Sequence, residues 1–180
     1  MKSINKIITI FIIIINLVPF FYLISPVSFP KDLPNSVKSN EPGDTVQIPN
    51  VAAFYTNLSR TEVINYYKAS YGGLFRIILN HPPEKSKEIF VDTMRSYYLE
   101  EFILPFKESL YINGFEWEND VFTKPEKRIK NRLVYENKEY KAKITIRTFP
   151  VSIPKRILSF LLMEFGAFFI FLLIAKRKVK

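Results

Sequence analysis

The sequence predicts an α+β domain, with two helices on one face of an antiparallel sheet, flanked by N- and C-terminal transmembrane helices. Three observations predict this fold: an apolar run at each end of the chain, one clear helix signature, and an alternating strand pattern near the end of the polar middle. A chain of 180 residues has room for one domain of ordinary size between the apolar runs.

The two apolar runs are Ile7–Ser25 and Ile157–Ala175, and each contains 19 residues. At about 1.5 Å of rise per residue, each run makes a helix of about 28 Å, close to the roughly 30 Å hydrocarbon thickness of a bilayer. We therefore expect a multi-pass protein of the cell membrane, with the lipid bilayer as its first partner and spans over residues 7–25 and 155–175.

The charged side chains of both tails, residues 1–6 and 176–180, are all basic. The positive-inside tendency then predicts that both termini are cytoplasmic and that the middle of the chain is extracytoplasmic. Lys31, Lys155 and Arg156 lie on the other side of the spans and argue against this orientation. A cleaved signal peptide is the competing interpretation of the first run, but its length favours an uncleaved signal anchor.

The composition excludes some function classes. The chain has 26 Lys and Arg against 17 Asp and Glu, but the tails hold six of the basic residues, so the middle is nearly balanced. A nearly balanced domain is a poor candidate for nucleic-acid binding, and we expect no nucleic-acid partner. The absence of cysteine excludes disulfides, thiol catalysis and cysteine-ligated zinc.

The polar middle begins with a proline-rich segment. Residues 26–50 contain five prolines, which predicts an extended stalk leading into a domain over residues 51–154, with residues 45–48 as a possible edge segment. Ser59 and Glu62 then have the spacing of a capping box, in which each side chain bonds the backbone N–H of the other residue. The helix that begins there has an apolar stripe and should end at two glycines. The stripe consists of Val63, Ile64, Tyr67 and Tyr71, and the glycines are Gly72 and Gly73.

The rest of the domain alternates short strand and helix signals. A strand is predicted over residues 74–79, a second helix over 82–97, strands over 99–104 and 109–112, and a polar loop over 118–131. A hairpin of residues 133–135 and 139–149 turns around Asn137. In its last strand, alternate residues should face the core, namely Tyr140, Ala142, Ile144 and Ile146.

Glu164 is the most unusual single residue, because it lies about 10 Å into the second span. Asn16 lies at a similar depth in the first span, so the two side chains could form a polar contact within the membrane. An ionisable group in lipid is by default a functional hypothesis, and a membrane-protein partner that binds through Glu164 is the alternative.

A basic loop is the second candidate site. Lys127, Arg128, Lys130 and Arg132 concentrate positive charge and could contact anionic lipid head groups or envelope polymers. The acidic residues just before it, in the run EWEND of residues 116–120, have the alternation that a hard cation requires, but no glycine or distal bidentate glutamate follows. We therefore expect no metal site and no cofactor.

Three stretches together resemble a group of small, uncharacterised two-span bacterial membrane proteins. These stretches are GDTVQIPNVAAFY (43–55), NHPPE (80–84) and ESLYINGFE (108–116). The resemblance would cover most of residues 43–149. It implies no activity and no site residues.

These observations favour a membrane-anchored extracytoplasmic domain of the cell envelope that acts in binding or assembly and is not an enzyme. One alternative is a carboxylate-dependent envelope hydrolase, which would need two convergent acids such as Glu108 and Glu116 across a hairpin. The other is an accessory subunit of a membrane transport complex, which depends only on Glu164.

Overall fold

The structure is a computed structural model that describes residues 2–42, 44, 49–74, 76–80, 85, 88 and 107–177. The chain divides into two compact units. The first contains Met1–Val27, Leu104–Lys107 and Pro150–Lys180, and the second contains Ser28–Ile103 and Glu108–Phe149. The terminal helices thus belong to one unit and the sheet to the other.

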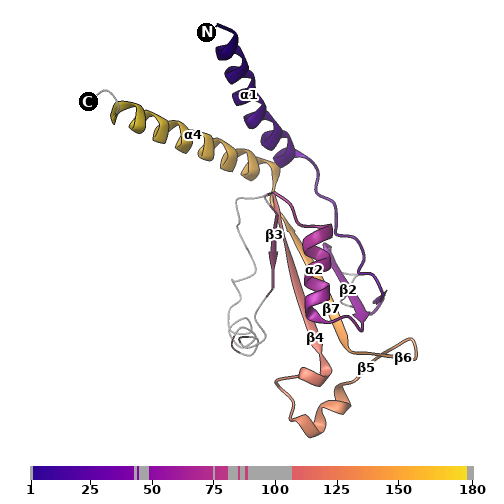
Figure 1. Cartoon of the computed structure of the whole chain (residues 1–180). Helices are drawn as coiled ribbons and strands as arrows, with labels where there is room; N and C mark the ends of the chain where they lie inside the picture. Colours follow the sequence, from indigo (N-terminus) through magenta and orange to yellow (C-terminus); the bar gives the residue numbers. More distant parts are fainter. Residues whose placement is uncertain are drawn as a thin grey trace. The chain divides into compact units, whose positions relative to one another are not determined.

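The first unit consists mainly of α1 (Lys2–Ile24) and α4 (Ile153–Arg177) (Figure 1). Phe20 of α1 packs against Phe160 of α4, with ring centroids 5.3 Å apart. Among the described residues, Ile153–Lys176 is the one helical stretch that is long and apolar enough to cross a membrane, because the apolar part of α1, Ile10–Ile24, is shorter. Both predicted spans therefore stay predictions, and α4 is the stronger candidate.

The second unit is α+β, as predicted, but its five-stranded sheet is mixed. The strands lie in the order β1-β2-β7-β4-β3. Their bounds are β1 Ser36–Lys38, β2 Val51–Thr56, β3 Arg76–Leu79, β4 Glu108–Glu116 and β7 Ala142–Pro150. β2 pairs with β7 in the antiparallel direction, whereas β3 runs parallel to β4, with Arg76 opposite Glu108. The prediction of an antiparallel sheet is therefore wrong at this edge, since the apolar pattern of a short strand does not encode its direction relative to a partner.

The predicted capping-box helix is confirmed as α2, Arg60–Ser70. Ser59 is its N-cap, and the backbone N–H of Ser59 donates to the Glu62 carboxylate over 2.8 Å. The helix ends where the glycines predict, and Gly72 is required there. A Cβ on Gly72 would lie 2.2 Å from the carbonyl oxygen of Lys68.

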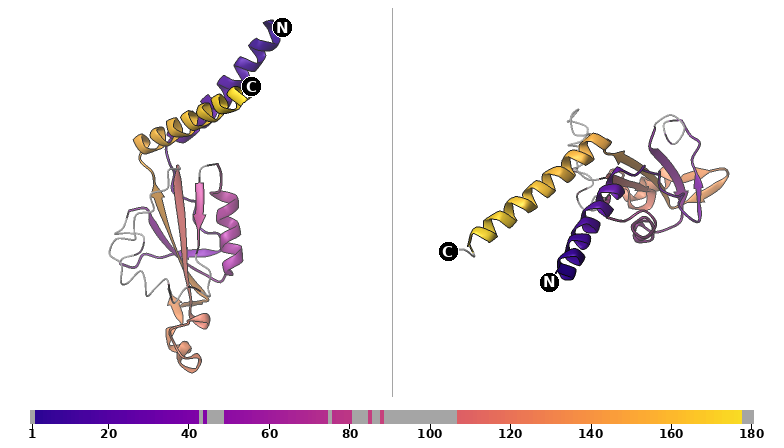
Figure 2. Two further views of the ribbon diagram at one scale, coloured as in Figure 1. Left: turned by 90° about the vertical axis from the view of Figure 1, so that its left-hand side faces the viewer. Right: turned by 90° about the horizontal axis from the view of Figure 1, so that it is seen from above.

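The core lies between α2 and one face of the sheet (Figure 2). Val63, Tyr67 and Tyr71 supply the helix side, and the alternation predicted for the last strand is confirmed for Ala142, Ile144 and Ile146, which are buried in this core. Tyr140 is buried too, but it lies before this strand and packs against Tyr55, with ring centroids 5.7 Å apart. Burying each large apolar side chain contributes roughly 1.5–3 kcal/mol, so this interface stabilises the unit. The second predicted helix, 82–97, lies outside the described residues apart from Lys85 and Glu88, as does the strand predicted at 99–104.

Part of the predicted stalk belongs to the sheet. β1 pairs with β2, with Ser36 opposite Thr56, and Leu33 is buried in the core. Residues 45–48, the predicted edge segment, lie outside the described residues. The prolines of this segment predict extended backbone, and an extended segment beside the edge of β2 pairs with it as a strand.

The predicted hairpin is present as β5 (Leu133–Tyr135) and β6 (Lys138–Tyr140), but its second strand, predicted over 139–149, is divided: β6 pairs with β5 in a separate two-stranded sheet, whereas β7 belongs to the five-stranded sheet. Glu136 and Asn137 form its two-residue turn with positive φ values of 49° and 62°, as a turn that matches strand twist requires. The segment between β4 and β5, predicted as a polar loop, contains two 3₁₀ helices, η2 (Trp117–Asn119) and η3 (Pro125–Asn131).

Candidate functional site

Residues 117–132, which we call the lysine loop, connect β4 to β5 at the far end of β4 from Glu108 (Figure 1). β4 runs from Glu108 to Glu116. Eight steps of about 3.3 Å therefore place the loop about 26 Å from the first residue of the strand. The loop thus lies beyond the packed part of the sheet.

Two side chains of η3 hold the loop together from inside. Arg128 donates from Nη1 to the carbonyl oxygen of Glu118 over 2.8 Å and from Nε to that of Thr123 over 3.3 Å. Asn131 donates from Nδ2 to Asp120 Oδ2 over 2.9 Å and to Thr123 Oγ1 over 3.0 Å. These bonds tie η3 to the segment that precedes it.

Asp120 is the acceptor at the centre of the loop. Its Oδ1 accepts a hydrogen bond from the backbone N–H of Phe122 over 2.9 Å. The Thr123 side chain and the Phe122 N–H lower the pKa of the Asp120 carboxyl, so the charged form holds the loop at neutral pH. Asp120 is therefore committed to the structure of the loop.

The inward position of Arg128 and Asn131 determines where the lysines lie. A 3₁₀ helix has 3.0 residues per turn, so side chains three apart share one face. Lys124, Lys127 and Lys130 have this spacing and lie one position before the inward row, and all three are exposed. At a rise of about 2 Å per residue, successive lysines are about 6 Å apart along the helix axis. We call these three residues the lysine row.

Apolar side chains are exposed beside the lysine row. Val121 is 49% exposed, Phe122 55% and Ile129 60%. Two neighbouring strand residues, Phe115 and Val134, are also exposed. The prediction of a polar loop did not take these apolar side chains into account, although the residues can be read directly from the sequence.

The structure separates the four basic residues that the sequence grouped. Lys127 and Lys130 share a row with Lys124, whereas Arg128 turns inward. Arg132 lies 3.6 Å from the Glu139 carboxylate of β6, and both side chains are 49% exposed. The pattern K-x-x-K-x-x-K, with a proline start signal directly after its first lysine, was the sequence feature that could have identified Lys124.

The predicted intramembrane contact involves two polar residues of the first unit. Asn16 donates from Nδ2 to the carbonyl oxygen of Ile12 in its own helix over 2.8 Å. Glu164 is exposed on α4. The hydrogen bonds of the described residues do not include one between Asn16 and Glu164, so this contact stays a prediction.

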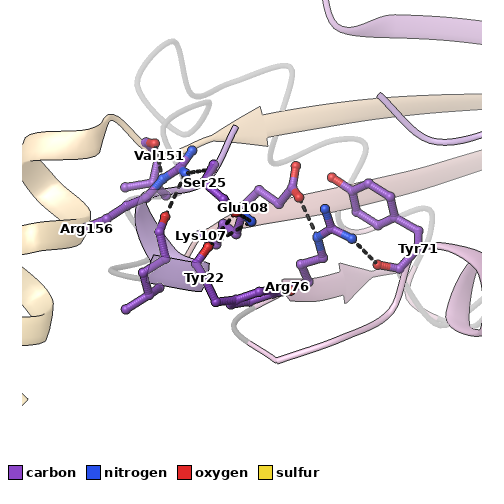
Figure 3. A network of polar contacts seen from close by, with 9 residues as sticks. Tyr22, Ser25, Tyr71, Arg76, Lys107, Glu108, Val151 and Arg156 are labelled. Atoms are coloured by element: carbon purple, nitrogen blue, oxygen red, sulfur yellow. Dashed lines mark hydrogen bonds and ion pairs between the residues drawn. The ribbon is translucent and has the colours of Figure 1, made fainter. Parts of the chain in front are cut away.

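The acid pair of the hydrolase alternative does not form. Glu108 and Glu116 lie at opposite ends of the same strand, β4, and not across a hairpin. Glu108 is instead a buried partner of Arg76, with Nε 2.5 Å from Oε1 and no exposure of the Glu108 side chain (Figure 3). The Arg76 guanidinium also lies 4.8 Å from the centre of the Tyr71 ring. The predicted pairing of Glu108 with Glu116 across a hairpin is therefore wrong.

A second charged cluster surrounds Lys143 of β7. Its ammonium group lies 2.9 Å from the Glu41 carboxylate and 2.8 Å from that of Asp44, and Tyr55 donates its hydroxyl to Glu41 over 2.7 Å. Burial lowers the pKa of Lys143, but the hydrogen bonds to Asp44 and Glu41 outweigh burial and raise it. The hydrogen bonds from Lys143 and Tyr55 lower the pKa of Glu41. This cluster fastens the segment before β2 to the sheet.

Within the first unit, two buried cations bind the carboxyl end of α1 (Figure 3). Lys107 donates to the carbonyl oxygen of Tyr22 over 3.0 Å and to Ser25 Oγ over 2.5 Å. Arg156 donates from Nη1 to the carbonyl oxygens of Leu23 and Ser25 over 3.0 and 3.1 Å. Cations suit the negative end of a helix and satisfy carbonyls that lack partners there. Arg156, which counted against the predicted orientation, therefore has a structural role.

The described residues contain no group of three or more His, Cys, Asp or Glu side chains placed to hold a metal ion. Comparison with family models, curated proteins and solved structures finds no match for this chain. The resemblance to two-span bacterial membrane proteins therefore stays a prediction.

Proposed function

We propose that this protein is a membrane-anchored binding domain of the cell envelope and that the lysine loop is its contact surface. In this proposal α4 is the principal anchor, α1 is a second, uncleaved span, and the sheet unit faces away from the cytoplasm. The observation that carries the proposal is the lysine row, whose three side chains are exposed at the N-cap of η3 and at two positions within it, three residues apart.

The internal bonds of the loop support this proposal. Arg128 and Asn131 donate hydrogen bonds that hold η3 to the segment before it. Within that segment, Asp120 also accepts a hydrogen bond from the backbone N–H of Phe122. A loop that is already ordered loses less conformational entropy when it binds a partner. The lysine row is thus presented on an ordered backbone.

The exposed Glu164 favours one second function, an accessory subunit that contacts another membrane protein. Glu164→Leu tests it by co-purification of partners from detergent extracts. Loss of a partner in the variant supports this function, and an unchanged set of partners removes it. The hydrolase alternative has no corresponding support, because Glu108 and Glu116, its example of two convergent acids, are at opposite ends of β4.

Photocrosslinking in intact cells tests the proposed contact surface. A photoreactive amino acid replaces Phe122 or Ile129 in the full chain, and Leu74 is the matched control because it is apolar and even more exposed, at 74%. We expect adducts at positions 122 and 129 to exceed those at position 74 several-fold. Equal yields at all three positions would contradict the proposal, because exposure alone would then explain them.

Thiol labelling tests the anchoring and orientation. The chain has no cysteine, so single cysteines at position 74 and in the C-terminal tail at position 178 are the only reactive sites. We expect a membrane-impermeant reagent to label position 74 in intact cells and position 178 only after the cells are opened. The opposite result would place the sheet unit in the cytoplasm.

A further inference from the structure

We infer that the lysine loop binds the surface of a bilayer that contains anionic phospholipids. This inference depends on the proposed function, since it names the partner of the same surface. It combines two properties of the loop: the line of ammonium groups and the apolar side chains beside them.

The lysine row supplies the electrostatic part. Lys127 and Lys130 are about 6 Å apart along the axis of η3, and Lys124 is its N-cap one turn earlier, so all three can approach one flat charged surface together. The attraction of basic side chains to anionic head groups is strong only within a Debye length, about 10 Å at 0.1 M salt. None of the three lysines takes part in an ion pair with the described residues.

The exposed apolar side chains supply the second part. Phe122 and Ile129 are more than half exposed, within a few residues of the lysines. Apolar side chains next to basic ones are typical of segments that bury apolar area at the boundary between head groups and acyl chains. Exposure of these two apolar side chains to water is unfavourable, so their burial at a membrane surface would lower the free energy.

The loop also carries acidic groups that oppose binding to an anionic surface. It contains five basic and three acidic residues, and Glu118 and Glu126 are exposed. Asp120 is buried and bonded within the loop. Because the excess of positive charge is modest, charge and apolar contact must act together. A soluble polyanion would use the lysines alone and leave Phe122 and Ile129 in water, whereas a bilayer surface accommodates both.

Vesicle binding by the full chain tests this inference. The protein is held in nanodiscs of phosphatidylcholine and mixed with vesicles of phosphatidylcholine, with or without about one third phosphatidylglycerol, which are then separated by flotation. We expect binding to the anionic vesicles that weakens as salt is added. Lys127→Gln with Lys130→Gln should weaken binding about thirtyfold, and Phe122→Ser with Ile129→Ser should weaken it as well.

Lys68→Gln with Lys141→Gln is the matched control, because it removes two exposed lysines of the same unit outside the loop. It should bind like the unchanged protein. Equal binding to both kinds of vesicle, or an equal loss in the control variant, would overturn the inference. Unchanged thermal unfolding of each variant shows that the comparison concerns binding and not folding.

The photocrosslinks at positions 122 and 129 separate this inference from the proposed function. Adducts to lipid support both. Adducts to a protein contradict the lipid inference and leave the loop as the contact surface. If these adducts do not exceed those at position 74, both are overturned.

Discussion

Cationic side chains have different roles in two regions of the sheet unit. In the sheet, Arg76 and Lys143 each lie against carboxylates, and Glu108 is completely buried. In the lysine loop, Lys124, Lys127 and Lys130 are exposed and outside the ion pairs of the described residues. The first group stabilises the fold, and the second is available for a partner. Residue type and total charge do not distinguish the two groups, because the difference depends on which carboxylates the fold brings close.

Replacing Arg76 should have the largest effect on stability. Arg76→Met leaves the buried Glu108 carboxylate without its cation and should lower the free energy of unfolding by about 3 kcal/mol. Chemical denaturation of the full chain in detergent measures this. The double variant Arg76→Met with Glu108→Gln should lose less, because it leaves no buried charge. A double variant that loses more than the single one would contradict this role of Arg76.

Replacing Lys143 should have an intermediate effect. Lys143→Gln removes the cation shared by Glu41 and Asp44, at a site where the lysine side chain is 24% exposed. We expect the free energy of unfolding to fall by about 1–2 kcal/mol. The exposed neighbour Lys141 provides the control, and Lys141→Gln should change it by less than about 0.5 kcal/mol. Similar losses in both variants would remove the distinction between paired and exposed lysines.

The Lys143 cluster should also make stability depend on pH at the acidic end. Hydrogen bonds from Lys143 and Tyr55 lower the pKa of Glu41 below its ordinary value of 4.5. The stability that Glu41 contributes is therefore fully present above that value and is lost as the pH falls through the pKa of the folded state. Thermal unfolding between about pH 6 and pH 3 measures this. Glu41→Gln should reduce the dependence, and an unchanged pH profile in this variant would contradict the assignment.

Changes in the lysine row should have the smallest effect on stability. Lys127→Gln with Lys130→Gln should change the free energy of unfolding by less than about 0.5 kcal/mol, because exposed side chains away from ion pairs contribute little. The same denaturation experiment measures this. A loss as large as that of Lys143→Gln would show that the row has structural partners.

Local sequence signals predicted the local parts of this fold. The capping box of Ser59 and Glu62 identified α2, and the alternation from Ala142 to Ile146 identified the core face of β7, because each depends on neighbouring residues. The parallel pairing of Arg76 with Glu108 joins residues 32 positions apart and has no local signal.

The candidate site was predicted only in part, for a related reason. A count of basic residues found the loop and included Lys127 and Lys130, but the count could not show that Arg128 turns inward. The three-residue spacing that places Lys124 in the row has meaning only once η3 is known to be a 3₁₀ helix. The exposure of Phe122 and Ile129 depends on the fold and could not be read from their residue types.

One measurement tests most directly whether the lysine row and the apolar side chains form one contact surface. It is crosslinking from position 122 in cells whose protein also carries Lys127→Gln and Lys130→Gln. We predict that the yield of adducts falls several-fold relative to the unchanged background, while the Lys68→Gln and Lys141→Gln background leaves it unaltered. An equal yield in all three backgrounds would contradict the account, since the exposed lysines would then have no part in what the loop binds.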